Sequence, residues 1–85
     1  MMEYAISDKR LINIILKFLN DRTKPKVVCD YLVDYDYDFD RVVVNIFYKK
    51  DTDHSLRYKI EVDVIDDIEG FFGISPFIHT HIGDC

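Results

Sequence analysis

Residues Leu56–Val64 read LRYKIEVDV, and the fold predicted for the whole chain depends on this stretch. Apolar and charged side chains alternate through it without a break. The apolar set is Leu56, Tyr58, Ile60, Val62 and Val64, and the charged set is Arg57, Lys59, Glu61 and Asp63. Because successive side chains of a strand point to opposite faces, this period of two predicts a half-buried β-strand.

Two more strands are predicted before this stretch and one after it. Lys26–Val33 is rich in Val and Tyr, and Arg41–Lys49 reads RVVVNIFYK. The latter has apolar side chains on both faces, which is typical of a central strand. Residues 50–55 are polar and predict a turn, while Phe77–Ile82 predicts a short edge strand.

A helix is predicted over Asp8–Arg22, with Ser7 as its N-cap and Pro25 just beyond its end. Its apolar residues are Leu11, Ile12, Ile14, Ile15, Leu16, Phe18 and Leu19. They cover an arc of roughly 200° at 100° per residue, which is wider than one sheet face requires. The excess predicts that part of this helix is covered by other segments or supports self-association.

After Val64, Asp66 and Glu69 have the spacing of a capping box, which predicts a short helical turn through Phe72 that ends at Gly73. Together these elements predict the α+β class. One amphipathic N-terminal helix packs on a three- to four-stranded antiparallel meander sheet, in a single domain spanning residues 1–85. A chain of this size buries roughly 60–65% of its unfolded surface, which leaves little room for a buried active site.

The charge is distributed unevenly along the chain. Residues 1–26 carry six basic and three acidic side chains, whereas residues 27–85 carry five basic and thirteen acidic ones, giving the net charge of −5. This asymmetry has two interpretations: the acidic part binds a protein partner with a basic surface, or the charge only keeps the protein soluble. The isoelectric point of about 4.9 opposes direct nucleic-acid binding.

The sequence contains no apolar run near the roughly 20 residues that span a bilayer and no secretory signal, so we expect a cytoplasmic protein without membrane association. Cys29 lies in an apolar run and Cys85 is the last residue. Two cysteines are fewer than a disulfide framework normally uses, so no disulfide is expected. Eleven Ile against one Ala indicates AT-rich codons. This composition resembles that of small accessory proteins of tailed phages and low-GC microbes. A viral protein of this kind would act in the host cytoplasm.

The stretch DYDYDFD, residues 34–40, alternates acids with aromatic rings. A calcium-binding EF-hand loop needs Gly at its sixth position and Glu at its twelfth. Counted from Asp34, these positions hold Phe39 and Asn45, so a calcium loop is not expected.

Two interpretations of this stretch stay open. As a strand, it would place Asp34, Asp36, Asp38 and Asp40 on one face about 6.7 Å apart, close to the spacing of nucleic-acid phosphates. The residues predicted to bind a partner are Asp34, Tyr35, Asp36, Tyr37, Asp38 and Asp40. Alternatively, the acids are the solvated end of a hairpin, where charge prevents strands of different molecules from pairing.

The pair His79 and His81 is a candidate metal site. In a strand both imidazoles lie on one face and can reach the same ion. Asp84, Cys85 or His54 could add ligands, but the usual spacing of a structural zinc site is absent.

No catalytic motif is present: the sequence lacks a nucleophile elbow, a Gly-rich phosphate loop and a Walker motif. We therefore expect no enzyme and no cofactor. The predicted function is a small interaction protein, such as an accessory or inhibitor protein, that docks on a basic partner through an acidic, aromatic-rich β face. The alternatives are a metal-binding protein that uses His79 and His81, or a structural component of a larger assembly.

Overall fold

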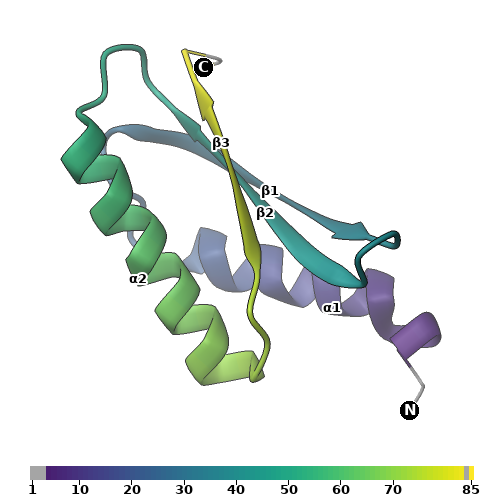
Figure 1. Cartoon of the computed structure of the whole chain (residues 1–85). Coiled ribbons are helices and arrows are strands. Elements are labelled where there is room, and N and C mark those ends of the chain that lie inside the picture. The colour runs from purple at the N-terminus through teal and green to yellow at the C-terminus, as the bar shows by residue number, and fades with distance from the viewer. Residues whose placement is uncertain (1–3, 84) are drawn as a thin grey trace.

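The computed structural model describes residues 4–83 and 85, with side chains described from residue 9 onward. Along this part of the chain lie two helices and one three-stranded sheet (Figure 1). The elements are α1 (Tyr4–Asp21), β1 (Val28–Asp36), β2 (Arg41–Tyr48), α2 (His54–Phe72) and β3 (Phe77–Ile82). The predicted α+β class is confirmed, and so is the edge strand Phe77–Ile82.

The sheet is mixed, with β2 in its centre. β1 lies antiparallel to β2, with Asp36 opposite Arg41. β3 lies parallel to β2, with Phe77 opposite Val43, so the predicted antiparallel meander is wrong. A parallel neighbour needs a crossover connection between the two strands, and α2 provides it.

The predicted strand Leu56–Val64 is also wrong, because these residues belong to α2. The buried residues of α2 are Ile60, Val64 and Ile68, spaced four apart. A spacing of four fits both a strand period of two and one face of a helix, so it does not separate the two structures. The other apolar residues of the alternating set, Leu56, Tyr58 and Val62, are exposed.

Both ends of α2 are capped. The Asp53 carboxylate accepts hydrogen bonds from the backbone N–H groups of Ser55 at 3.0 Å and Leu56 at 3.3 Å. At the other end Gly73 adopts a left-handed conformation, φ 68°, and its N–H donates to the Glu69 carbonyl. The helical turn predicted to begin at Asp66 is therefore the last part of one long helix, whose predicted end at Gly73 is correct.

The predicted N-terminal helix is confirmed as α1, although it begins at Tyr4 rather than at Asp8. Ser7 consequently lies within the helix and not at its N-cap. α1 contacts β1 and contributes two fully buried residues, Ile15 and Leu19, to the core.

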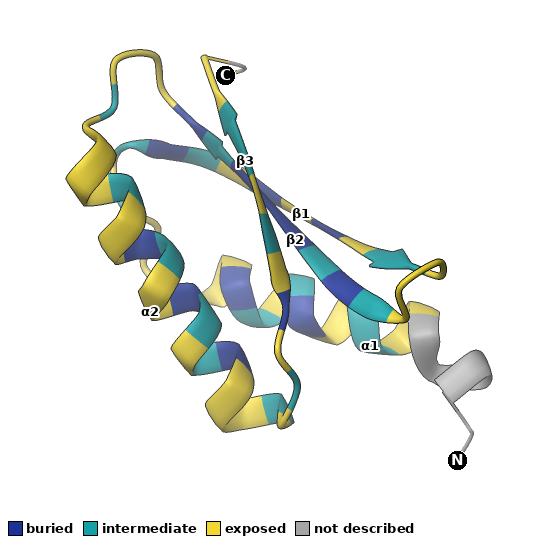
Figure 2. Ribbon diagram, viewed as in Figure 1, coloured by how far each residue is buried: buried dark blue, intermediate teal, exposed yellow. Residues whose placement is uncertain are grey.

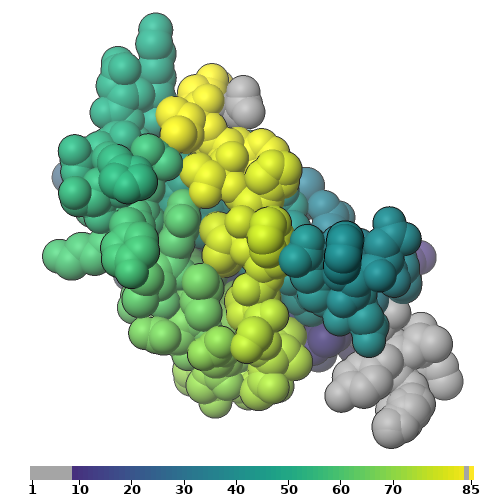
Figure 3. Space-filling view, in the orientation of Figure 1, coloured from purple at the N-terminus to yellow at the C-terminus, as the bar shows by residue number. Residues whose placement is uncertain are grey.

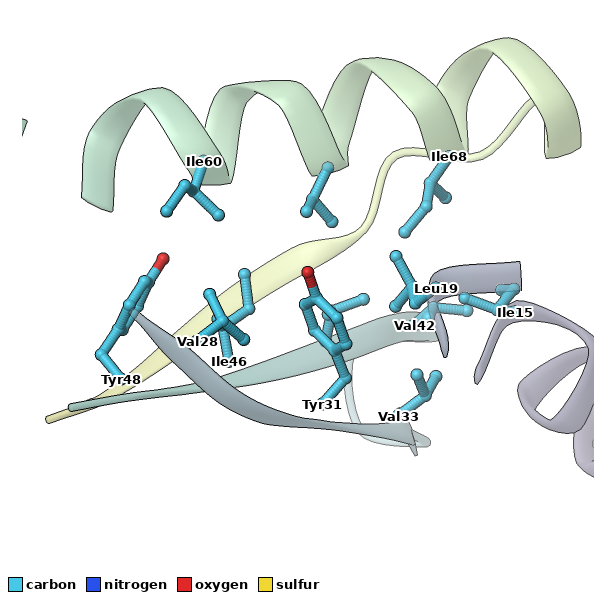
Figure 4. Packing of buried hydrophobic residues seen from close by; sticks show 12 residues of the cluster. Ile15, Leu19, Val28, Tyr31, Val33, Val42, Ile46, Tyr48, Ile60 and Ile68 are labelled. Carbon is cyan, nitrogen blue, oxygen red and sulfur yellow. The ribbon is translucent and has the colours of Figure 1, made fainter. Parts of the chain in front are cut away.

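The hydrophobic core lies between the sheet and the two helices (Figure 2). The sheet contributes Val28, Tyr31, Val33, Val42, Val44, Ile46 and Tyr48, and α2 contributes Ile60, Val64 and Ile68. Figure 4 shows Tyr31 and Tyr48 pointing from the sheet toward α2. Both helices cover this same face, and within the described residues no helix covers the opposite face of the sheet.

One half-buried carboxylate links α2 to two strands. Glu61 Oε2 accepts a hydrogen bond from the Tyr48 hydroxyl at 3.1 Å and another from the Thr80 hydroxyl at 2.7 Å. Burial, and then the nearby negative charge of Glu61, raise the pKa of Tyr48 above its usual value. Burial likewise raises the pKa of Tyr31.

The expectation that the cysteines stay unpaired is wrong in this structure. Cys29 near the start of β1 and Cys85 after β3 form a disulfide, with their Cα atoms 5.8 Å apart and a sequence separation of 56. The bond ties the outer strand β1 to the segment that follows the other outer strand, β3. The proximity of Cys29 and Cys85 could not be predicted, because residues 56–64 were expected to form a strand between them instead of the helix α2.

Candidate protein interface

The stretch DYDYDFD forms the closed end of the β1–β2 hairpin. Its first three residues, Asp34, Tyr35 and Asp36, finish β1, and residues 37–40 make the turn before Arg41. Asp40 adopts a positive φ of 54°, which Asp tolerates better than most residues. We call residues 34–41 the hairpin end; its acids do not line one straight strand face, as the phosphate-like spacing would require.

Three of the four acids are held by neighbours within the hairpin. Asp36 accepts a hydrogen bond from the Asp38 N–H at 3.1 Å and pairs with Arg41 Nε at 3.4 Å. Asp34 accepts from the Asn45 amide at 3.4 Å, and Asp40 accepts from the Tyr35 hydroxyl. These contacts fix the shape of the hairpin end and leave much of its negative charge at the surface.

Two aromatic rings project from the turn. Tyr37 is 71% exposed and Phe39 is 70% exposed. Tyr37 contacts the ring of Tyr35, with centroids 4.9 Å apart, and Tyr35 itself is half-buried. Exposed rings on an ordered turn are suited to binding another protein, since aromatic residues are enriched at interfaces.

Arg41 lies between two phenylalanine rings. Its guanidinium carbon is 4.0 Å from the ring centroid of Phe77 and 4.8 Å from that of Phe39. Asp36 supplies the opposite charge on the same guanidinium. Arg41 and Phe77, neither of them predicted as site residues, thus join the hairpin end to β3.

The side of the sheet opposite the helices, which we call the helix-free face, extends from the hairpin end. Strand pairing arranges its residues in rows across the three strands. The rows are Asp30, Phe47 and His81; Leu32, Asn45 and His79; and Asp34, Val43 and Phe77. In the space-filling view, β3 is at the surface between α2 and the hairpin end (Figure 3). Asp30 thus lies beside the ring of Phe47, and Asp34 shares a row with Phe77, with Val43 between them.

Asn45 organises the centre of this face and is only 6% exposed. Its amide nitrogen donates to Asp34 at 3.4 Å and to the Leu32 carbonyl at 3.2 Å. Its amide oxygen lies 2.9 Å from His81 Nε2. In the sequence, the one feature that could have predicted this polar centre is the single Asn within the apolar run RVVVNIFY.

The two predicted metal ligands do come together on the helix-free face. The rings of His79 and His81 have centroids 4.5 Å apart, and His81 also stacks on Phe47 at 4.4 Å. Among the described residues, however, no group of three or more His, Cys, Asp or Glu side chains could hold a metal ion. His54 contacts Arg57 instead, and Cys85 is in the disulfide. Asp84 lies outside the described residues.

The wide apolar arc of α1 is only partly covered. Phe18 packs against Phe71 and Phe72 at the end of α2, with ring centroids 4.8 and 5.4 Å apart. Ile14 is 48% exposed and Phe71 is 73% exposed. We call these four residues the phenylalanine patch.

No helix of the described chain is long and apolar enough to cross a membrane. No protein-family model matches the sequence, and no curated protein or solved structure shows significant similarity to it. Function therefore has to be inferred from the geometry of the surfaces.

Proposed function

We propose that this chain is a small non-enzymatic interaction protein that docks on a basic protein partner through its hairpin end. The observation that supports this function is the pair of exposed rings, Tyr37 and Phe39, on a turn held in shape by carboxylates. Exposed rings provide contact area, and the surrounding acids select a basic surface.

The predicted partner-binding residues divide into two roles in this proposal. Tyr37 and Asp38 at the turn contact the partner, together with Phe39. Asp34, Tyr35, Asp36 and Asp40 hold the turn through their contacts within the hairpin and add to its negative potential. An accessory or inhibitor protein could act by such docking alone, without a catalytic site.

Capture of partners from a lysate of the source cells tests the aromatic part. A Tyr37→Ser/Phe39→Ser variant is expected to lose the captured protein while its melting temperature stays unchanged. The matched control is Tyr58→Ser, which removes a ring that is also 66% exposed but lies on α2. Equal capture by both variants would exclude the hairpin end as the docking site.

The electrostatic part has its own test. Replacing Asp34, Asp36 and Asp38 with Asn is expected to abolish capture, and capture by the unmodified protein is expected to weaken as salt is raised. Retained binding by the triple variant would contradict the proposed charge recognition. Folding of the variant is checked by its melting temperature, because Asp36 also contacts Arg41.

A further inference from the structure

A cleft lies on the helix-free face at the opposite end of the sheet from the hairpin end. Cys29, Asp30, Phe47 and Cys85 line an open cleft of about 340 Å³. Phe47 lies across from Asp30 in the strand pairing, so the cleft combines an aromatic ring with a carboxylate. Within the described part of the chain, Asp30 forms no ion pair, and its Oδ1 accepts only the Tyr31 N–H.

The molecule already shows how such a combination holds a cation. At the hairpin end, Phe39, Phe77 and Asp36 together surround the guanidinium of Arg41. A planar guanidinium stacks on aromatic rings and pairs with carboxylates, whereas a lysine ammonium is a compact, strongly hydrated charge that stacks less well.

We infer that the cleft beside the disulfide binds an arginine side chain of the basic partner. This inference rests on the proposed function and extends the docking surface from the hairpin end across the helix-free face. The guanidinium stacks on Phe47 and pairs with Asp30. The stacking of His81 on Phe47, with an angle of 11° between the rings, holds the Phe47 ring in place from β3.

The geometry also limits the partner. Position 41 at the hairpin end and position 47 at the cleft are six residues apart on β2, which corresponds to roughly 20 Å of strand. A partner segment that reaches both sites in extended form therefore places its arginine about six residues from the part that contacts the turn.

The test uses the oxidised protein and two fluorescent peptides, nine arginines and nine lysines, which carry equal charge. Fluorescence anisotropy at physiological salt is expected to show at least tenfold tighter binding of the arginine peptide. Asp30→Asn and Phe47→Leu are each expected to reduce that preference to less than threefold. Asp66→Asn on α2, which changes the net charge by the same amount as Asp30→Asn, is expected to leave the preference unchanged.

Equal affinity of the wild-type protein for the two peptides would overturn the inference, as would equal effects of Asp30→Asn and Asp66→Asn. Asp30 is exposed, so its variant stays informative even if Phe47→Leu does not fold. The two proposals fail separately. If Tyr37→Ser/Phe39→Ser loses the partner but the protein shows no preference for arginine, only the proposal for the cleft fails. If the protein prefers arginine but that variant still captures the partner, only the proposal for the hairpin end fails.

Discussion

Glu61 is the residue through which α2 is bonded to both strands that it connects. Its carboxylate accepts hydrogen bonds from Tyr48 on β2 and Thr80 on β3. Because a hydrogen bond to a charged group contributes more than a neutral one, Tyr48→Phe is expected to lower the free energy of unfolding by about 1–3 kcal/mol. Urea unfolding measures this loss. The control Tyr58→Phe, at an exposed position of α2, is expected to leave the stability unchanged.

Tyr48 also makes stability depend on pH at the alkaline end. Burial and the Glu61 charge raise the pKa of Tyr48 above the ordinary value of 10.0. The folded state therefore holds this proton more tightly than the unfolded state does, so the stabilisation is complete below about pH 10 and is lost as the pH rises above it. The free energy of unfolding is expected to fall less steeply between pH 8 and 11 in Tyr48→Phe. Parallel curves for the two proteins would show that Tyr48 does not titrate in this way. Some slope persists in the variant, because burial also raises the pKa of Tyr31.

At the scale of elements, α2 depends on its two caps. Asp53→Ala removes the acceptor of two backbone N–H groups and is expected to lower stability by about 1 kcal/mol. Gly73→Ala places a Cβ at a φ of 68° and is expected to lower stability by a similar amount, about 1 kcal/mol. Thermal unfolding measures both losses. Asp66→Ala, an exposed position within α2, is the control and is expected to have little effect.

The phenylalanine patch lies where α1 meets the end of α2, and its exposed apolar side chains, Ile14 and Phe71, predict weak self-association. Sedimentation at increasing concentration is expected to show a rise in average mass. Phe71→Ser is expected to abolish this rise, and Tyr58→Ser is expected to preserve it. A constant monomer mass for the unmodified protein would show that the exposed part of α1 has no such role.

The elements that sequence predicted correctly are those whose pattern has a single interpretation. The apolar arc of α1 fits only a helix. The segment RVVVNIFY is rich in β-branched and aromatic residues, which favour a strand over a helix. The prediction of a strand at residues 56–64 was wrong because Ile60 and Val64, four positions apart, lie on one face of either a strand or a helix. The cap at Asp53 could have decided the question, since Asp is a preferred N-cap residue. At the candidate site, exposed acids and rings were predictable, whereas the roles of Phe47 and Phe77 depend on a strand order that includes β3 beside β2.

For the molecule as a whole, the disulfide is the main constraint between distant parts of the chain. Loop-closure entropy for a separation of 56 residues corresponds to about 4 kcal/mol of stability. Cys85→Ser is therefore expected to lower the free energy of unfolding by up to that amount, and reduction of the unmodified protein is expected to have the same effect. Unchanged stability in both cases would show that the bond does not constrain the fold. Disulfides are typical of oxidising compartments and rare in the cytoplasm. The cytoplasmic location expected from the sequence therefore stays a prediction.

The same bond divides the chain mechanically. Cys29 and Cys85 close a covalent ring that contains β2, α2, β3 and nearly all of β1, and α1 lies outside it. When force is applied between the first and last residues, only residues 1–29 can lengthen, to about 100 Å at roughly 3.5 Å per residue. The reduced chain can reach about 300 Å on the same basis. Under tension, α1 would therefore be pulled from the core first. The force would then pass from Cys29 through the disulfide to Cys85, so that β1, β2 and β3 would not be stretched.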